Sequence, residues 1–164
     1  MTDFIRTTQK PGQALPVQQN ASQVHNIRGA ELEFRWQASE DLRISGNYSV
    51  RNPDDDEFRV VEVPKQNAYL RSDWAFNSSW NWNLQGSWFG NRNRASNDSR
   101  DDLEDYLIVD TTMRYTGQVD WELVMSMRNL LNESVLEHTN PTSSADDLPL
   151  PKRNFYAEIS YKFH

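Results

Sequence analysis

Apolar and polar side chains alternate with a period of two over most of this sequence. From Phe155 to Phe163 the odd positions are Phe, Ala, Ile, Tyr and Phe, whereas the even positions are Tyr, Glu, Ser and Lys. Successive side chains of a β-strand point to opposite faces of a sheet. The segment therefore predicts a strand with one apolar and one polar face, and helical periodicity is scarce elsewhere in the chain.

Six earlier segments follow the same rule, and most of them have about the length that a tilted strand needs to cross a bilayer. They are Ala30–Gln37, Leu42–Arg51, Asn67–Trp74, Trp80–Trp88, Leu107–Tyr115 and Trp121–Arg128. Together with the last segment they predict an all-β fold, an antiparallel meander of about 7–8 strands.

The connections between these segments are alternately short and long. The short ones are tight turns at Ala38–Asp41, Asn77–Ser79 and Thr116–Asp120, and the long, polar ones are Pro53–Val61, Asn91–Asp105 and Leu131–Lys152. A transmembrane β-barrel has this arrangement, with short periplasmic turns and longer external loops. We therefore expect a strand stub and an external loop in residues 1–22, and barrel strands in residues 23–163.

A soluble β-sandwich also buries one face of each strand, so alternation alone leaves that class open. Aromatic residues, which make up 12% of the chain, favour the membrane barrel because many of them lie near strand ends. Rings at the ends of membrane strands form girdles at the level of the lipid headgroups. The predicted interfacial girdle consists of Trp36, Trp74, Trp80, Trp82, Tyr106, Tyr115 and Trp121, which we expect beside the short turns.

The opposite face of the predicted strands is charged, which suits a wet or plugged barrel lumen. Charges on a closed inner wall need partners of opposite sign, so we expect the carboxylates among them to pair with nearby arginines. The predicted lumen charges are Arg35, Arg71, Asp73, Asp110, Arg114, Glu122 and Arg128.

The composition excludes several other classes of protein. A net charge of −7 without a basic stripe argues against a nucleic-acid partner. The chain has no cysteine, which excludes disulfides and thiolate chemistry. It has no apolar run long enough for a membrane helix, and its opening segment has no apolar signal core.

No residue pattern points to catalysis, a cofactor or a metal. A nucleophile elbow is absent, and His25, His138 and His164 are scattered. The acidic runs Asp54–Glu57 and Asp101–Asp105 lack the spacing of an EF-hand, so solvated loops are a simpler interpretation than a Ca²⁺ site. We therefore expect a protein that is not an enzyme. The Trp-rich segment Trp80–Trp88 leaves one alternative, a soluble sandwich that binds glycans on its flat rings.

Several stretches together resemble the C-terminal part of TonB-dependent outer-membrane receptors. Asn20–Trp36 resembles a strand entry of that family, with Gly29 and Glu31 at the expected places. The other matching stretches are Val63–Trp74 with its Pro, Tyr106 and Asp110 in a Tyr-x-x-x-Asp element, Asn129–Leu130 at a strand end, and the closing LPLPKRNFYAEISYKF.

The resemblance implies a piece of a 22-stranded barrel in the outer membrane of a Gram-negative bacterium. It implies an importer of a scarce nutrient, such as siderophore-bound iron, haem or cobalamin. The implied partners are outer-membrane lipid, the remainder of the barrel with its plug domain, and the TonB system through that plug. It also implies that the barrel-assembly machinery recognises the last strand, through Phe155, Ala157, Ile159, Tyr161 and Phe163.

The chain departs from the family in what it lacks. Neither a plug domain nor a TonB box is visible, seven strands are about a third of such a barrel, and His164 follows the usual terminal aromatic residue. We therefore expect a fragment, a truncated gene product or one part of a split receptor. A small autonomous outer-membrane barrel is the remaining alternative.

Overall fold

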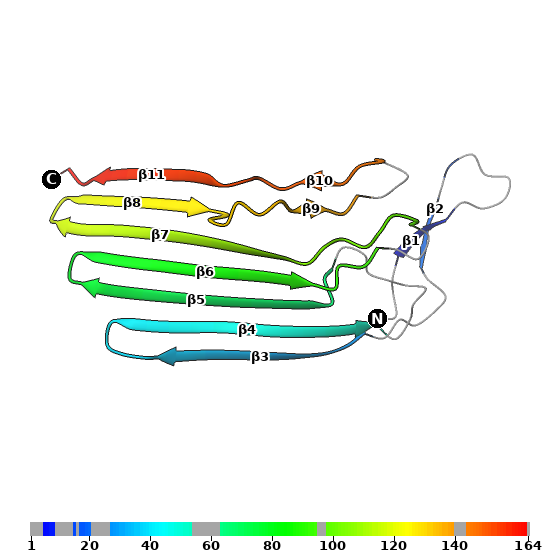
Figure 1. Ribbon diagram of the computed structural model, residues 1–164, viewed down its shortest axis with the longest axis horizontal. Coiled ribbons are helices and arrows are strands. Elements are labelled where there is room, and N and C mark those ends of the chain that lie inside the picture. Colours follow the sequence, from blue (N-terminus) through cyan, green and yellow to red (C-terminus); the bar gives the residue numbers. More distant parts are fainter. Residues whose placement is uncertain are drawn as a thin grey trace.

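The computed structural model describes residues 5–8, 15, 17–20, 27–53, 63–94, 98–139 and 144–163. Seven antiparallel strands form one sheet in the order β11-β8-β7-β6-β5-β4-β3, so nearly every strand lies beside its neighbour in the sequence (Figure 1). They are β3 (Ile27–Gln37), β4 (Leu42–Pro53), β5 (Gln66–Asn77), β6 (Trp80–Gly90), β7 (Tyr106–Gln118), β8 (Trp121–Arg128) and β11 (Asn154–Tyr161). The predicted all-β meander is confirmed.

Two short hairpins accompany the sheet. Strand β1 (Ile5–Thr8) pairs with β2 (Val17–Asn20), and neither pairs with the seven-stranded sheet. Strand β9 (Leu136–Glu137) pairs with β10 (Leu148–Pro149) inside the connection that leads from β8 to β11. The described residues contain no helix that is long and apolar enough to cross a membrane.

The short turns lie at one end of the sheet, and β4, β6 and β8 end at the other, where the longer connections begin (Figure 1). We call these the turn end and the loop end. The structure corrects one turn boundary, because β7 continues through Gln118 instead of ending before Thr116. The backbone N–H of Thr116 donates to the carbonyl of Ser79 at 2.8 Å, which keeps the strand paired, and the register shifts between Tyr115 and Gln118. Only Val119 and Asp120 separate β7 from β8.

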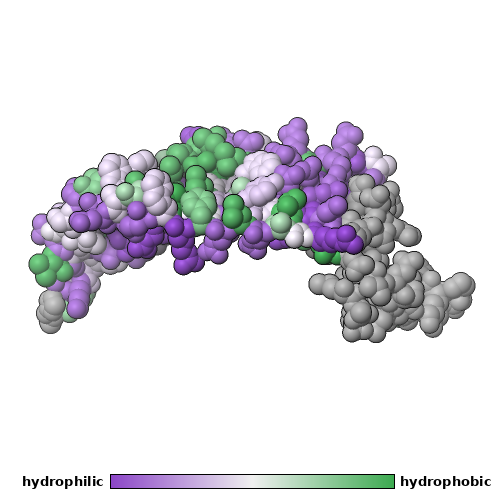
Figure 2. All heavy atoms as spheres, turned by 90° about the horizontal axis from the view of Figure 1, so that it is seen from below, coloured by the Kyte–Doolittle hydropathy of each residue, from purple (hydrophilic) through white to green (hydrophobic). Residues whose placement is uncertain are grey.

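Most apolar side chains of the seven strands fall on the same face of the sheet. The register places Leu70 opposite Gly46 on one side and Gly86 on the other, and Met125 opposite Met113 and Ala157. Figure 2, an edge-on view, shows hydrophobic side chains gathered over the middle of the strands on the upper side. A single register therefore separates an apolar face from a polar face across the whole sheet.

The apolar face is not covered by another layer within the described residues. Val135 is the one buried hydrophobic side chain among them, whereas Leu32 and Ile159 are each 68% exposed. A β-sandwich would have a second sheet packed on this face. The described strands also form an open sheet whose edges are β3 and β11, so they do not close into a small barrel by themselves. Neither alternative fold fits this arrangement.

Candidate functional site

Arg94 joins the connection after β6 to the connection after β8. Its backbone N–H donates to Asp102 Oδ1 at 2.7 Å and its Nε donates to the carbonyl of Asp101 at 2.6 Å, which folds the first connection around the side chain. Its Nη1 donates to Asp147 Oδ1 in the second connection at 2.9 Å, and its Nη2 donates to Asp147 Oδ2. The two side chains are only 6% and 9% exposed, so water screens this pair little.

Arg100 and Asp98 extend this pair into a cluster. Arg100 donates from Nε and Nη2 to Asp98 at 3.0 and 2.7 Å, and from Nη1 to Asp147 Oδ1 at 3.2 Å. Its Nη2 also donates to the carbonyl of Thr139 at 2.7 Å. Asp98 is 1% exposed. We call Arg94, Asp98, Arg100 and Asp147 the loop cluster; its two cations and two carboxylates balance in charge.

The arginines hold both carboxyl groups of the loop cluster ionised. Hydrogen bonding from Arg100 lowers the pKa of Asp98 from 3.8 to about 2, and hydrogen bonding from Arg94 lowers the pKa of Asp147 from 3.8 to about 2. Burial acts in the opposite direction on both groups and is outweighed. The same bonds raise the pKa of Arg94 and of Arg100.

The loop cluster is expected to withstand mild acid. A carboxyl group whose pKa is lowered by folding stabilises the folded state above its ordinary pKa of 3.8, and this contribution is lost as the pH falls toward about 2. The amide of Leu150, which donates to the carbonyl of Val135 at 2.9 Å, reports on this region. Its protection from hydrogen exchange, corrected for intrinsic rates, should stay constant down to about pH 5 and fall between about pH 4 and about pH 2. A loss centred near about pH 6 would contradict the assignment.

Arg92 makes a second link between the same two connections. Its side chain is 7% exposed, and its Nη2 donates to the carbonyl of Leu136 at 2.7 Å while its Nη1 donates to the carbonyl of Glu104 at 3.2 Å. Its guanidinium carbon lies 4.6 Å from the centre of the Tyr106 ring, which is a cation–π contact. The two long connections are therefore fastened by buried arginines at two places.

The position of Tyr106 corrects the sequence analysis, which placed it beside a short turn. Tyr106 is the first residue of β7 and directly follows a long connection, so it lies at the loop end. Its register partner is Phe89, and the ring centroids are 4.9 Å apart. Because Leu107 belongs to the apolar face, its neighbour Tyr106 lies on the polar face. Tyr106 therefore packs under Arg92 and is not part of the turn-end girdle.

The other predicted girdle residues lie in the turn-end part of their strands. They are Trp36, Trp74, Trp80, Trp82, Tyr115 and Trp121. Their rings contact one another across strands. The Trp80 and Tyr115 centroids are 4.8 Å apart, as are those of Trp121 and Tyr161. Phe76, which the sequence analysis missed, stacks on Trp80 at 6.4 Å. That these rings mark a membrane interface stays a prediction.

A chain of hydrogen bonds crosses four strands on the polar face. The hydroxyl of Tyr69 donates to Gln85 Oε1 at 3.0 Å, and Gln85 Nε2 donates to Asp110 Oδ2 at 3.3 Å. Arg128 Nη1 donates to the same Asp110 oxygen at 3.0 Å. Asp110 is therefore the central acceptor of this face, and its carboxylate ties β6 and β8 to β7.

The remaining predicted lumen charges also form ion pairs. Arg71 pairs with Asp73 at 2.8 Å, and Arg114 pairs with Glu122. Each of the three predicted carboxylates therefore has an arginine partner. Arg35 instead pairs with Glu33 on its own strand, at 3.0 Å. That this face lines a lumen stays a prediction.

Asn129 directly follows β8 and shapes the start of the next connection. Its φ of 51° lies in the left-handed region, which Asn tolerates better than most residues. Its side chain is buried, and its Oδ1 accepts from the backbone of Glu133 at 2.8 Å while its Nδ2 donates to the carbonyl of Glu133 at 2.9 Å. Its backbone N–H donates to Asp110 Oδ1 at 2.9 Å. The polar face therefore fixes the direction in which the long connection leaves the sheet.

The residues of the predicted assembly signal lie on or just after the edge strand β11. Phe155, Ala157, Ile159 and Tyr161 share one face of this strand, and Phe163 follows it with 85% of its surface exposed. One side of β11 pairs with β8, and no strand of the described part pairs with the other side. Recognition by the assembly machinery stays a prediction.

No metal site is found within the described ranges, where no group of three or more His, Cys, Asp or Glu side chains could hold an ion. His138 Nε2 lies 3.9 Å from Asp98 Oδ2. In the second acidic run, Asp105 Oδ1 accepts from the backbone of Asn91 at 2.8 Å, as Asp102 does from Arg94, so these carboxylates serve the loop itself. The run Asp54–Glu57 and the residues His25 and His164 lie outside the described residues.

The comparisons with known proteins agree with this geometry. The sequence matches the family described as "TonB dependent receptor-like, beta-barrel" over residues 1–130. The structure is similar to that of the copper transporter OprC, with a TM-score of 0.77 and 17% identity over 98% of this chain and 26% of that chain. No curated protein sequence matches the chain.

A ferric enterobactin receptor and a ferric-catecholate import receptor are also similar. A mutant of the ferric enterobactin receptor PfeA from Pseudomonas aeruginosa has a TM-score of 0.75 and 16% identity, over 99% of this chain and 27% of that chain. The ferric-catecholate import receptor Fiu from E. coli K12 has a TM-score of 0.67 and 13% identity, over 84% of this chain and 21% of that chain. Identities this low establish a shared fold. The chain spans about a quarter of the length of these proteins.

Proposed function

The chain belongs to the TonB-dependent receptor family as a piece of its outer-membrane β-barrel, and from this premise we propose that it forms the C-terminal wall of a receptor that imports a scarce nutrient. The observation that carries the proposal is the seven-stranded meander with one uncovered apolar face, which aligns with receptor barrels over nearly its whole length. In a membrane, lipid covers such an apolar face, and the backbone N–H and C=O groups form hydrogen bonds between neighbouring strands.

We assign the turn end to the periplasm and the loop end to the outside of the cell. Outer-membrane barrels have short periplasmic turns and longer external loops, and the described connections divide in this way. The turn-end aromatic rings then lie at the periplasmic interface. The loop cluster then lies in the external vestibule, where it holds two loops together beside the path of an incoming ligand.

The proposed role is passive and involves no covalent catalysis. The candidate ligands are siderophore-bound iron, haem, cobalamin or a similar nutrient, and OprC and PfeA carry the names of a copper transporter and a ferric enterobactin receptor. Ligand choice in such a receptor would depend on its external loops and on its plug domain. The Arg94–Asp147 link contributes by fixing the shape of two of those loops.

The proposed partners follow from this placement. Outer-membrane lipid covers the apolar face, and the remainder of the barrel continues the sheet beyond β3 and β11. The plug domain occupies the lumen against charges such as Arg71 and Asp73, and the TonB system acts through that plug. The barrel-assembly machinery recognises β11 by strand addition, because an unpaired edge offers backbone hydrogen bonds.

The orientation can be tested by cysteine labelling, since the chain has no cysteine of its own. Leu131 at the loop end and Val119 at the turn end are both exposed hydrophobic residues, 55% and 98% respectively. In a receptor that contains this chain, Leu131→Cys should react with a membrane-impermeant maleimide on intact cells. Val119→Cys should react only after the outer membrane is permeabilised. The reverse pattern would overturn the orientation, and recovery of the protein in the soluble fraction would overturn the function.

A further inference from the structure

Two elements singled out in the sequence, the Tyr-x-x-x-Asp element and the Asn129–Leu130 element, are bonded to each other in the structure. The first lies in β7 and the second directly follows β8. Asp110 Oδ1 accepts from the backbone N–H of Asn129 at 2.9 Å, and the carbonyl of Val109 accepts from the backbone N–H of Leu130 at 2.7 Å. Two successive backbone groups after β8 are therefore bonded to two successive residues of β7.

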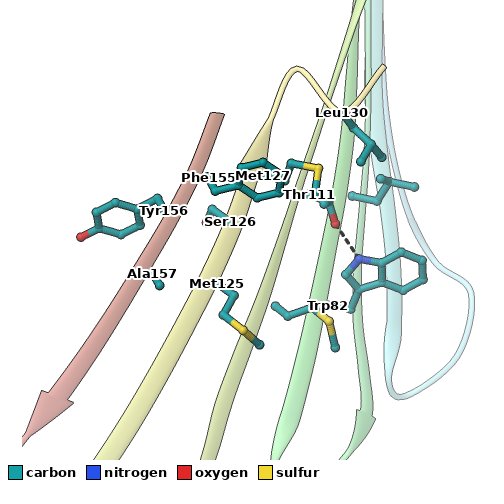
Figure 3. A pocket seen from close by; sticks show the side chains of 11 residues that line it. Trp82, Thr111, Met125, Ser126, Met127, Leu130, Phe155, Tyr156 and Ala157 are labelled. Carbon is teal, nitrogen blue, oxygen red and sulfur yellow. Dashed lines mark hydrogen bonds between the residues drawn. The ribbon is translucent and has the colours of Figure 1, made fainter. Parts of the chain in front are cut away.

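The side chain of Leu130 holds the same segment from the other face of the sheet. Figure 3 shows Leu130 just beyond the end of β8, on the side of the sheet that carries Thr111 and Trp82. These three side chains line one apolar pocket. Asp110 directly precedes Thr111 in β7 and so lies on the opposite, polar face. The first residues after β8 are therefore fixed against β7 on both faces.

Asn129 joins the beginning of the long connection after β8 to its end. Its side chain is 4% exposed and bonds to both backbone groups of Glu133, and its Nδ2 also donates to the carbonyl of Pro151 at 3.3 Å. Farther along, the backbone N–H of Leu150 donates to the carbonyl of Val135 at 2.9 Å, and β9 pairs with β10. The connection is therefore a hairpin that continues β8 and β11 beyond the sheet, with Asn129 at its base (Figure 1).

Tyr106, the other residue of the Tyr-x-x-x-Asp element, contacts this hairpin at β9. Tyr106 and Asp110 are four residues apart in one strand, so both lie on its polar face. The hydroxyl of Tyr106 donates to Glu137 Oε1 at 3.4 Å. Arg92, which packs on the Tyr106 ring, donates to the carbonyl of Leu136 in the same strand β9. One face of β7 therefore holds the hairpin both at its base and at β9.

The carboxylate of Asp110 is held in one orientation by neighbouring strands. Its Oδ2 accepts from Arg128 Nη1 at 3.0 Å and from Gln85 Nε2 at 3.3 Å. The side chain is 16% exposed, so water replaces these partners poorly. With Oδ2 bonded to β6 and β8, Oδ1 is the oxygen that accepts from Asn129. The orientation of one carboxylate on the polar face therefore determines where the hairpin begins.

We propose that Asp110 is a positioning residue of the receptor, which sets through Asn129 the direction of the β9–β10 hairpin, while Tyr106 supports the hairpin at β9. Because Arg94 and Asp147 tie the connection after β6 to this hairpin, Asp110 positions both connections. The consequence for ligand capture at the loop end rests on the proposed function, whereas the position of the hairpin does not.

The test measures the position of the hairpin by pulsed dipolar EPR in a purified receptor that contains this chain. Spin labels are attached at Leu148→Cys in β10 and at Val63→Cys before β5, where the native side chains are 61% and 40% exposed. The distribution of distances should be narrow. Asp110→Leu should widen it at least about twofold, because losing a hydrogen bond to a charged group weakens the attachment roughly ten- to hundredfold. Asp110→Asn should keep it narrow, since an amide oxygen still accepts from the backbone N–H of Asn129.

Asp73→Leu is the matched control. Asp73 is a carboxylate on the same face that accepts from Arg71 Nε at 2.8 Å and from Asn83 Nδ2 at 2.9 Å, and both of these partners lie in β5 and β6. Its loss should leave the distribution of distances unchanged. Heat-modifiable gel migration confirms that each variant is folded before it is compared.

Each contrary outcome has a distinct meaning. An unchanged distribution in the Asp110→Leu protein, or equal widening by Asp73→Leu, would overturn the positioning role of Asp110. Equal widening by Asp110→Asn and Asp110→Leu would overturn the bond to Asn129 as the connection. The cysteine labelling at Leu131 and Val119 reports separately whether the orientation and the proposed function are wrong, because the EPR distance does not depend on them.

Discussion

Replacing Arg94 with methionine is expected to release the two long connections from each other. The change leaves the buried carboxylate of Asp147 with Arg100 as its one remaining cation in the loop cluster. Removing one partner of a buried ion pair costs about 3–5 kcal/mol. Because this ion pair joins two loops, we expect the lost free energy to appear as local opening of those loops. The amides of Leu103 and Leu150 should exchange with solvent at least about a hundredfold faster.

Two comparisons make this prediction specific. Arg51→Met, which removes an exposed arginine at the same end of the sheet, should change exchange at Leu103 and Leu150 little. Adding Asp147→Leu to Arg94→Met should restore part of the protection, since an apolar pair of similar volume removes the uncompensated charge. If Arg94→Met changed exchange at Leu103 alone, the two connections would not be coupled through this side chain.

Val109→Arg is expected to lower the free energy of unfolding in a bilayer by about 2–4 kcal/mol. Val109 lies on the apolar face opposite Gly86, in the half of β7 nearer the loop end. A guanidinium there would be placed in the hydrocarbon of the membrane, where the penalty for Arg is largest at the midplane. The measurement is reversible denaturation of a receptor that contains this chain, reconstituted in lipid vesicles.

Ile108→Arg provides a matched control. Ile108 is the adjacent β-branched residue, it is also half-buried, and it lies on the polar face opposite Ser87. An arginine at this position would join a face that already carries Arg114 and Arg128, so we expect a change of less than about 1 kcal/mol. Equal destabilisation by the two variants would show that the apolar face does not contact lipid.

The strands could be predicted from the sequence because alternation is a local property. Each apolar position in Phe155–Phe163 is determined by its neighbours two residues away, and the sheet pairs segments in sequence order, so local signals were sufficient. Strand ends were predicted less well. At Thr116 the sequence turns polar and includes Gly117, and the backbone nevertheless stays in the ladder.

The alternation of apolar and polar residues does not predict the environment of Tyr106 or the loop cluster. Residue type alone predicts a girdle position for Tyr106, whereas its actual environment depends on Arg92 from the preceding connection. The contact between Arg94 and Asp147 joins residues far apart in the sequence, in segments without any period. The first long connection carries three arginines and the second carries four carboxylates, but acidic residues in a polar loop predict by themselves no more than a solvated surface. Ion pairs between two loops can be identified only from the three-dimensional structure.

The lack of a buried interior in the described part of the sheet has a consequence for how this chain tolerates change. In a soluble domain, shortening a core side chain opens a cavity that the rigid surroundings cannot fill. Here Val135 is the one buried hydrophobic residue of the described part, and side chains such as Leu32 and Ile159 face outward. Their packing partners would be fluid acyl chains, which flow into any space that a smaller residue leaves. A change in the thickness or composition of the host membrane would then alter the packing around every outward side chain at the same time.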